Sequence, residues 1–294
     1  MGFVDRYITC TNKDGYSTTF GERKLSPFLL TDATGIYEVA NNVTISNNTM
    51  SDGGAYQGSV AKVRNIVLTI KDIDDHVAHR NVLRALFKSG EPGELVFHED
   101  TTELKISYYV ESLTSTGAFG ARTYTVSLLC PDPFWYALDD ITLFMAAWND
   151  NFEFQHEFTS LGEEFGYRSA SLLQTIMNEN ASDGIGMDIL IKAIGAVTNP
   201  SVSHVERSET IKVGSVTKSL SMVAGDELRI TTSDNDKHVY LTHLGTTTEI
   251  NEYLTESSVF IQLMRGSNTI GYSADSGVAN MVVQITYRLK YAGA

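Results

Sequence analysis

The sequence predicts a mostly β protein with two domains: an N-terminal β-rich domain with one helix over residues 1–133, and a C-terminal β-sandwich or jelly roll over residues 134–294. Three observations support this prediction. Short runs of alternating apolar and polar residues recur with turn sequences between them, which is typical of sandwiches and jelly rolls. Only one stretch of the N-terminal half has clear helical periodicity. The 294 residues are enough for two ordinary domains.

The first elements of the N-terminal half are expected to be short and exposed. A β-hairpin is predicted from flanks at 7–11 and 16–20 around the turn sequence between them. A strand is predicted at Gly35–Val39 and is followed by Asn-rich polar sequence that contains Val43 and Ile45. The residues 51–55, Ser-Asp-Gly-Gly-Ala, predict a flexible loop.

The clearest strand and the best helix of this half are neighbours in the chain. In the strand 63–71 apolar residues occupy every second position, which predicts one buried face. The helix is expected to begin at an N-cap, Asp74 or Asp75, and to end at Gly90. Its apolar stripe is Val82, Leu83, Leu86 and Phe87. A turn at 91–94, strands at 95–98 and 104–110, and a glycine-containing turn lead to the next strand.

That next strand ends at a proline-rich stretch, residues 128–136, on which the domain boundary is based. Alternating residues up to Cys130 predict a half-buried strand, which must stop at Pro131 because proline lacks a backbone donor. Pro133 follows, and then the aromatic residues 134–136. We interpret this stretch as a rigid seam between two β domains. A tight loop inside one domain is the alternative.

The second half reads mostly as β. Residues 141–158 are rich in aromatic side chains, and 167–180 fits a helix by spacing and a strand less well. The last strand, 280–291, has the longest alternation. The other expected strands are 186–193, 210–213, 220–223, 227–232, 237–242 and 258–263, separated by turn sequences.

Composition and charge exclude several classes of protein. A net charge of -14 repels phosphate backbones, so specific nucleic-acid binding is not expected. No apolar run is long enough to span a membrane, and Asp5 and Arg6 come too early for a secretory signal. Arg6 also replaces the Ser or Thr that myristoylation of Gly2 would need. Cys130 lies on the apolar face of its strand, which favours buried thiols over a disulfide with Cys10.

One cluster has the composition of a metal site. His76 and His79 lie beside Asp72, Asp74 and Asp75. Carboxylates at a helix start are expected for capping and for the helix dipole, and no third strong ligand follows at useful spacing. We therefore expect no metal site and no cofactor.

Catalytic motifs are incomplete. The sequence 271–275 begins like a nucleophile elbow but has Asp275 in place of the second glycine, and we expect a hairpin loop there. The carboxylate pairs Asp139-Asp140 and Glu163-Glu164 are adjacent in sequence, so on a strand they would point to opposite faces and form no dyad. No catalytic residues are assigned, and the residues indicate a non-enzymatic protein.

The order of these parts resembles a known family. Residues 63–68, the helix after them and the strand ending in 131–136 match in the first half. The second half matches at 184–200, 224–232, 263–275 and 285–287. Together they resemble the distal tail proteins (Dit) of long-tailed, non-contractile bacteriophages (siphophages), which are hub components of the tail tip or baseplate.

The resemblance implies a structural virion protein. It implies that the N-terminal domain forms a homo-oligomeric ring, typically a hexamer, that joins the tail tube protein on one side and the tail-associated hub or lysin protein on the other. The C-terminal domain is then expected to be a galectin-like β-sandwich to which a receptor-binding protein attaches. The protein would be assembled in the bacterial host cytoplasm and reside in the virion. The resemblance also favours strand for residues 167–180.

Carbohydrate binding by the C-terminal sandwich is the alternative function. Trp148, Phe152 and Phe154 offer aromatic faces on which sugar rings stack, although core packing is the commoner use of such side chains. The His-x-Asn-x-Arg sugar site of true galectins is missing from the sequence.

Overall fold

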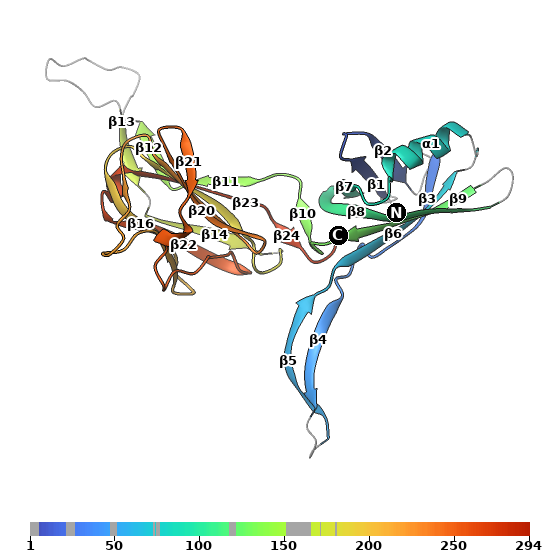
Figure 1. Cartoon of the computed structure of the whole chain (residues 1–294), viewed down its shortest axis with the longest axis horizontal. Helices are drawn as coiled ribbons and strands as arrows, with labels where there is room; N and C mark the ends of the chain where they lie inside the picture. The colour runs from blue at the N-terminus through green and yellow to red at the C-terminus, as the bar shows by residue number, and fades with distance from the viewer. Residues whose placement is uncertain are drawn as a thin grey trace. The chain divides into compact units, whose positions relative to one another are not determined.

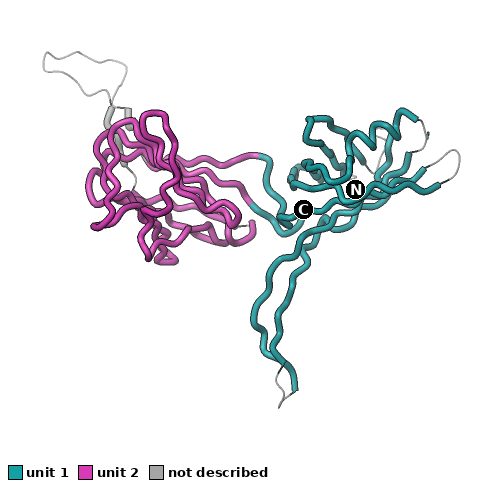
Figure 2. The backbone as a smooth tube through the Cα atoms, viewed as in Figure 1, with its two compact units in different colours: residues 1–138, 290–294 teal, residues 139–289 magenta. Residues whose placement is uncertain are grey.

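The computed structural model describes residues 6–21, 27–47, 52–72, 74, 77–117, 122–150, 166–170, 172–179 and 181–294. These residues form a mostly β protein, as predicted (Figure 1). The chain divides into two compact units (Figure 2). Unit 1 consists of residues 1–138 and 290–294, and unit 2 of residues 139–289. Among the helices that the structure describes, none is long and apolar enough to span a bilayer.

Unit 1 is built on a sheet that closes on itself. Its strand order is β24-β10-β8-β7-β1-β2-β3-β6-β9, and β8 also pairs with β9, which closes seven of the strands into a barrel. The long strand β8 makes this closure possible because it carries a bulge between Val110 and Ser112. The strands are β1 (Arg6–Asn12), β2 (Ser17–Gly21), β3 (Phe28–Thr34), β6 (Arg64–Asp72), β7 (Pro92–Glu99), β8 (Thr102–Thr116), β9 (Arg122–Cys130), β10 (Trp135–Ala137) and β24 (Lys290–Tyr291).

The core of unit 1 follows the predicted alternation. On β6, Ile66, Leu68 and Ile70 are fully buried, as the pattern in 63–71 required. The helix α1 (Val77–Leu86) adds Leu83 and Leu86 to the same core. The predicted helix is thus confirmed, but it ends at Leu86, before Gly90. Of its two expected caps, Asp74 lies three residues before the first helical residue, and Asp75 lies outside the described residues. Both cysteines are buried and free, as expected.

Three expectations for unit 1 were wrong. The turn predicted at 91–94 is mostly strand, because β7 already begins at Pro92 and pairs with β8 from there. Residues 35–39 do not form a strand, because Gly35 adopts a left-handed turn with φ of 79° and the strand, β3, comes before it. The 51–55 loop is shorter than predicted, since Gly54 already belongs to β5 (Gly54–Ala61). β5 pairs with β4 (Asn41–Asn47) in a long hairpin that extends away from the barrel (Figures 1 and 2).

Unit 2 contains two main sheets, each with one buried face. The first has the order β11-β23-β15-β19-β20-β21, and the second the order β14-β22-β16-β17, with β18 paired to β16. The strands are β11 (Ile141–Phe144), β14 (Leu173–Asn178), β15 (Met187–Ala193), β16 (Val197–His204), β17 (Glu209–Lys212), β18 (Ser221–Met222), β19 (Glu227–Ser233), β20 (Asp236–His243), β21 (Thr246–Glu249), β22 (Gly266–Ser276) and β23 (Met281–Tyr287). The hairpin β12 (Ala146–Asp150) and β13 (Gly166–Ala170) and the 3-10 turns η1 (Asn251–Tyr253) and η2 (Val278–Asn280) complete it.

Several predictions for unit 2 are settled by these strands. The segment 167–180 forms strands, β13 and β14, as the resemblance favoured. The expected hairpin loop at 271–275 is wrong, because these residues continue β22 and pair with β16. Residues 258–263 form only an isolated bridge, between Leu263 and Ile185. Two layers of strands agree with a sandwich, while the galectin-like detail stays a prediction.

The chain passes from unit 1 to unit 2 a few residues after the domain boundary predicted between residues 133 and 134. The turn at Pro131–Pro133 lies inside unit 1, because the next strand, β10, pairs with β8 of the same sheet. The crossing comes after Leu138. The predicted last strand, 280–291, also divides: β23 ends at Tyr287, and β24 returns to pair with β10 in unit 1.

Candidate interaction site

The most unusual surface of unit 1 is the β4–β5 hairpin. Its strands pair from Asn41↔Ala61 to Asn47↔Gly54, and in the described part of the chain they pair only with each other. Every residue of β4 is exposed, and almost all of β5 is. A two-stranded ribbon without a packed face is only marginally stable in water, so a covering partner would stabilise it.

Three exposed apolar side chains share one face of this hairpin, while Val60, 72% exposed and opposite Asn42, points to the other face. Ile45 lies opposite Tyr56, and Val43 precedes Ile45 by two positions, so all three side chains point to the same side. Their exposed fractions are 57% for Ile45, 66% for Tyr56 and 55% for Val43. We call these three residues the hairpin face. Full burial of a Val or Ile side chain is favourable by about 1.5–3 kcal/mol, so removing this face from water would stabilise a complex.

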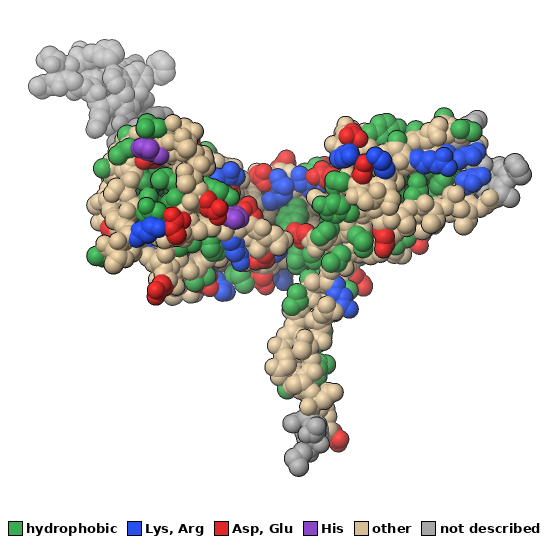
Figure 3. All heavy atoms as spheres, viewed as in Figure 1, with side chains coloured by type: hydrophobic (Ala, Val, Ile, Leu, Met, Phe, Trp, Pro, Cys, Tyr) green, Lys and Arg blue, Asp and Glu red, His purple; other side chains and the backbone are tan. Residues whose placement is uncertain are grey.

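Charge is missing from the same element. Neither β4 nor β5 contains Asp, Glu, Lys or Arg, although 20% of the chain is charged. Figure 3 shows the ribbon nearly free of charged side chains between its base and its tip. Exposed strand edges normally carry charges, Pro or bulges that prevent pairing with another chain. An uncharged ribbon with one bulge, at Thr44 and Ile45, has little such protection.

A buried arginine fixes the base of the hairpin. Arg64, three residues after β5, is 4% exposed and donates from Nε to the carbonyl of Pro133 at 2.7 Å. Its Nη1 donates to the carbonyls of Gly35 and Ile36, both at 2.7 Å, and its Nη2 donates to that of Ala292. The guanidinium therefore ties together the loop before β4, the turn after β9 and the C-terminal residues.

Trp135, one of the three aromatic residues at 134–136, completes this anchor. Trp135 is fully buried, its Nε1 donates to the carbonyl of Ile36 at 2.9 Å, and Arg64 lies 5.8 Å from its ring centroid. The sequence pointed to this stretch but gave no sign of its partner, because Arg64 reads as an ordinary charged residue at a strand start.

The metal-like cluster is only partly brought together. His79 Nδ1 lies 3.0 Å from Oδ1 of the fully buried Asp72, and Asp72 Oδ1 also accepts from the backbone of Asp74 at 3.2 Å. His76 and Asp75 lie outside the described residues. Within the described ranges, no group of three or more His, Cys, Asp or Glu side chains is placed to hold a metal ion.

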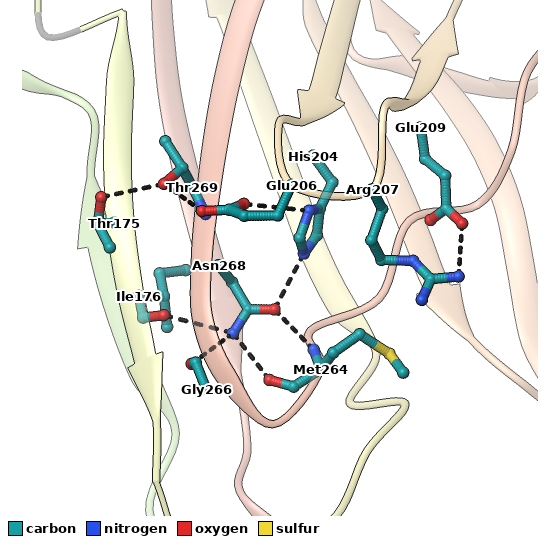
Figure 4. Close-up of polar contacts among 10 residues, drawn as sticks. All are labelled: Thr175, Ile176, His204, Glu206, Arg207, Glu209, Met264, Gly266, Asn268 and Thr269. Atoms are coloured by element: carbon teal, nitrogen blue, oxygen red, sulfur yellow. Dashed lines mark hydrogen bonds and ion pairs between the residues drawn. The ribbon is translucent and has the colours of Figure 1, made fainter.

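A histidine–carboxylate network in unit 2 has the composition of a catalytic site (Figure 4). His204 is buried, with Nε2 2.9 Å from Asn268 Oδ1 and Nδ1 3.4 Å from Glu206 Oε2. Asn268 Oδ1 also accepts from the backbone of Met264, and its Nδ2 donates to carbonyls of Ile176, Met264 and Gly266. His204 must therefore donate from Nε2.

This network holds strands together. The side-chain amide of Asn268 forms its hydrogen bonds with main-chain atoms and with His204. The Glu206 carboxylate accepts hydrogen bonds from both the backbone N–H and the hydroxyl of Thr269. These bonds lower the pKa of Glu206. Because the polar groups bind one another and the backbone of β14 and β22, the arrangement stabilises the end of the second sheet.

The other candidate residues are dispersed. Asp140 forms a two-point ion pair with Arg288. Asp275, in the sequence that resembled an elbow, accepts hydrogen bonds from Asn199 on β16 and Lys212 on β17. Trp148 belongs to β12, while Phe152, Phe154 and the pair Glu163-Glu164 lie outside the described residues.

Comparison with solved structures finds the same fold along the whole chain. The crystal structure of SPP1 Dit, described as a paradigm of the hub adsorption apparatus in Gram-positive infecting phages, matches with a TM-score of 0.68 at 14% identity, over 97% of this chain and 99% of that one. A chain of the phage P2 baseplate in its activated conformation with Ca matches with a TM-score of 0.51 at 10% identity, over 100% of both chains. No family model matches the sequence, and no curated protein does. The predicted resemblance in fold is thereby confirmed.

Proposed function

We propose that this chain is a distal tail hub protein of a long-tailed bacteriophage, and that copies of it join through unit 1 into a ring, a hexamer. The observation that carries this proposal is the β4–β5 hairpin, an uncharged ribbon with an exposed apolar face on a fold shared with SPP1 Dit. The role is structural, without catalysis.

The hairpin suits a head-to-tail contact between copies. A projecting element that docks on a different surface of the next copy makes a heterologous interface, and such interfaces close into rings when the rotation allows. Docking would remove Val43, Ile45 and Tyr56 from water, and the absence of charge in both strands avoids a desolvation cost.

The proposed partners are those of a tail hub in the virion. One side of the ring would bind the tail tube protein and the other the tail-associated hub or lysin protein. A receptor-binding protein would attach through unit 2. Assembly would take place in the bacterial host cytoplasm. A net charge of -14 would also keep DNA from adhering as it passes the ring.

Mass determination tests the proposal. Light scattering on the purified chain should give a mass near six times 32.4 kDa, and negative-stain images of the same peak should show annular particles. Tyr56→Lys should reduce the mass to that of one chain without unfolding unit 1, while Tyr16→Lys, at an exposed tyrosine outside the hairpin, should leave it unchanged. A wild-type mass of one chain at all concentrations would contradict ring formation.

Glycan binding by unit 2 is the second candidate function. The observation that favours it is a polar groove on the outer face of the first sheet, lined by residues of β15, β19, β20 and β21.

A further inference from the structure

We propose that the outer face of β15, β19, β20 and β21 is a binding site for an uncharged saccharide, with Arg229 as its central donor. The groove there has a volume of about 490 Å³, which lies within the range of small-ligand sites. This inference rests on the second candidate function, glycan binding, and is independent of ring assembly.

Strand register places six of the eight groove residues in two rows. Leu190, Arg229 and Tyr240 lie opposite one another on β15, β19 and β20. Two residues along the strands is the second row, in which Glu227 lies opposite Thr242, and Thr242 lies opposite Thr247 on the edge strand β21. Because opposite residues point to the same side, both rows project from the outer face.

Arg229 is held in a fixed orientation at the centre of the first row. Its Nε donates to both carboxylate oxygens of Asp188, at 2.9 and 3.0 Å, and its Nη2 donates to Oδ2. This pairing raises the pKa of Arg229, so the guanidinium is charged at any working pH. In the described part of the chain Nη1 has no acceptor, and it is available to a ligand oxygen.

The second row supplies fixed acceptors and hydroxyls. Glu227 pairs with Lys192 at 2.7 Å, which holds its carboxylate at the surface. The hydroxyls of Thr242 and Thr247 lie 2.8 Å apart, and each can donate or accept. A ligand with neighbouring hydroxyl groups can therefore donate to Glu227 and accept from Arg229 and the threonines in one pose.

Charge around the groove decides the class of ligand. Carboxylates outnumber cations there, so a phosphate- or sulfate-bearing polymer would be repelled. The charged groups are Asp188, Glu227, Asp236 and Glu249 against Lys192 and Arg229.

Apolar surface lies beside the polar groups in the first row. Leu190 is on one side of Arg229, and on the other is Tyr240, whose ring is stacked on His238 with centroids 5.6 Å apart. Sugar rings combine hydroxyl edges with apolar C–H faces, so they match a surface of this composition. A neutral hexose or N-acetylhexosamine unit is the ligand we infer.

The test uses the full-length chain and immobilised neutral oligosaccharides built from hexoses and N-acetylhexosamines, with a sulfated glycan and a polyglycerol phosphate as anionic probes. Neutral glycans that bind are then titrated by calorimetry against wild type, Arg229→Ala, Arg229→Lys and Arg207→Ala. Arg207 is the matched control, because it is an exposed arginine of unit 2 that is also paired with a carboxylate, Glu209 at 2.6 Å.

The expected result is binding of at least one neutral glycan that weakens about tenfold or more in both Arg229 variants and is unchanged in Arg207→Ala. Thermal unfolding of the variants should match wild type, since Arg229 is exposed. Neutral-glycan binding that both Arg229 variants keep would overturn this site while leaving glycan binding by the chain in place. Binding of no glycan, or of the anionic probes alone, would overturn both.

Discussion

Replacing Arg64 by Met should destabilise unit 1 strongly. Methionine replaces the aliphatic stem of the arginine, but the substitution removes the guanidinium donors to the carbonyls of Gly35, Pro133 and Ala292. The carbonyl of Ile36 is spared, because it still accepts from Trp135 Nε1.

The magnitude follows from the orphaned carbonyls. Each buried acceptor left without a donor costs about 1–3 kcal/mol, and a hydrogen bond to a charged group contributes about 1.5–3 kcal/mol. Two of the three carbonyl contacts are only partly buried and can be rehydrated, so we expect a loss of about 3–5 kcal/mol in the free energy of unfolding of unit 1. Arg64→Lys should lose less, since an ammonium can reach some of the acceptors.

The assay is urea unfolding followed by the fluorescence of Trp135. Because the chain has two tryptophans, a Trp148→Phe background assigns the signal to unit 1. With a urea dependence of about 2 kcal/mol/M, the midpoint should fall by about 1.5–2.5 M. Lys71→Met, at an exposed position of β6, is the control and should change the midpoint little. A shift in Arg64→Met as small as that of the control would refute the anchoring role.

Three further predictions concern other parts of the fold. Glu206 has a lowered pKa in the folded state, so its carboxylate stabilises unit 2 at pH values above 4.5, the ordinary pKa of this group. This stabilisation should be lost as the pH falls below 4.5, and Glu206→Gln should remove that part of the pH dependence of thermal unfolding. Burial raises the pKa of Cys10, and that of Cys130 to about 12, so an aromatic disulfide reagent at pH 8 should react with them only after unfolding. Gly35→Ala should cost unit 1 about 2–4 kcal/mol in urea unfolding, since its Cβ would lie 2.1 Å from a backbone oxygen, whereas Gly15→Ala, with a similar φ and open space, should cost about 1 kcal/mol.

Periodic elements with one buried face could be predicted from the sequence. The strand β6 and the helix α1 were recognised because their apolar residues repeat at the spacing that burial requires. The strand β16 was missed because the dipeptide Asn199-Pro200 within it is a turn signal in a sequence, and Asn199 does adopt a left-handed φ of 48°. Pairing with β22 overrides these local preferences.

The candidate sites were harder to predict. The β4–β5 hairpin has three Asn residues in β4, two Gly residues in β5 and no core face, so its local sequence does not predict its length. The groove proposed to bind a saccharide depends on strand register, which brings Leu190, Arg229 and Tyr240 together from three strands. Sequence spacing alone does not encode that register.

Photo-crosslinking from the hairpin tests the central claim, that this ribbon joins one copy of the chain to the next. A photoreactive phenylalanine analogue replaces Tyr56, or Tyr16 as the control, in the full-length chain. The account predicts crosslinks from position 56 to unit 1 of another copy, in a ladder that ends at six chains, and few between copies from position 16. Crosslinks from position 56 that remain within a single chain would contradict it.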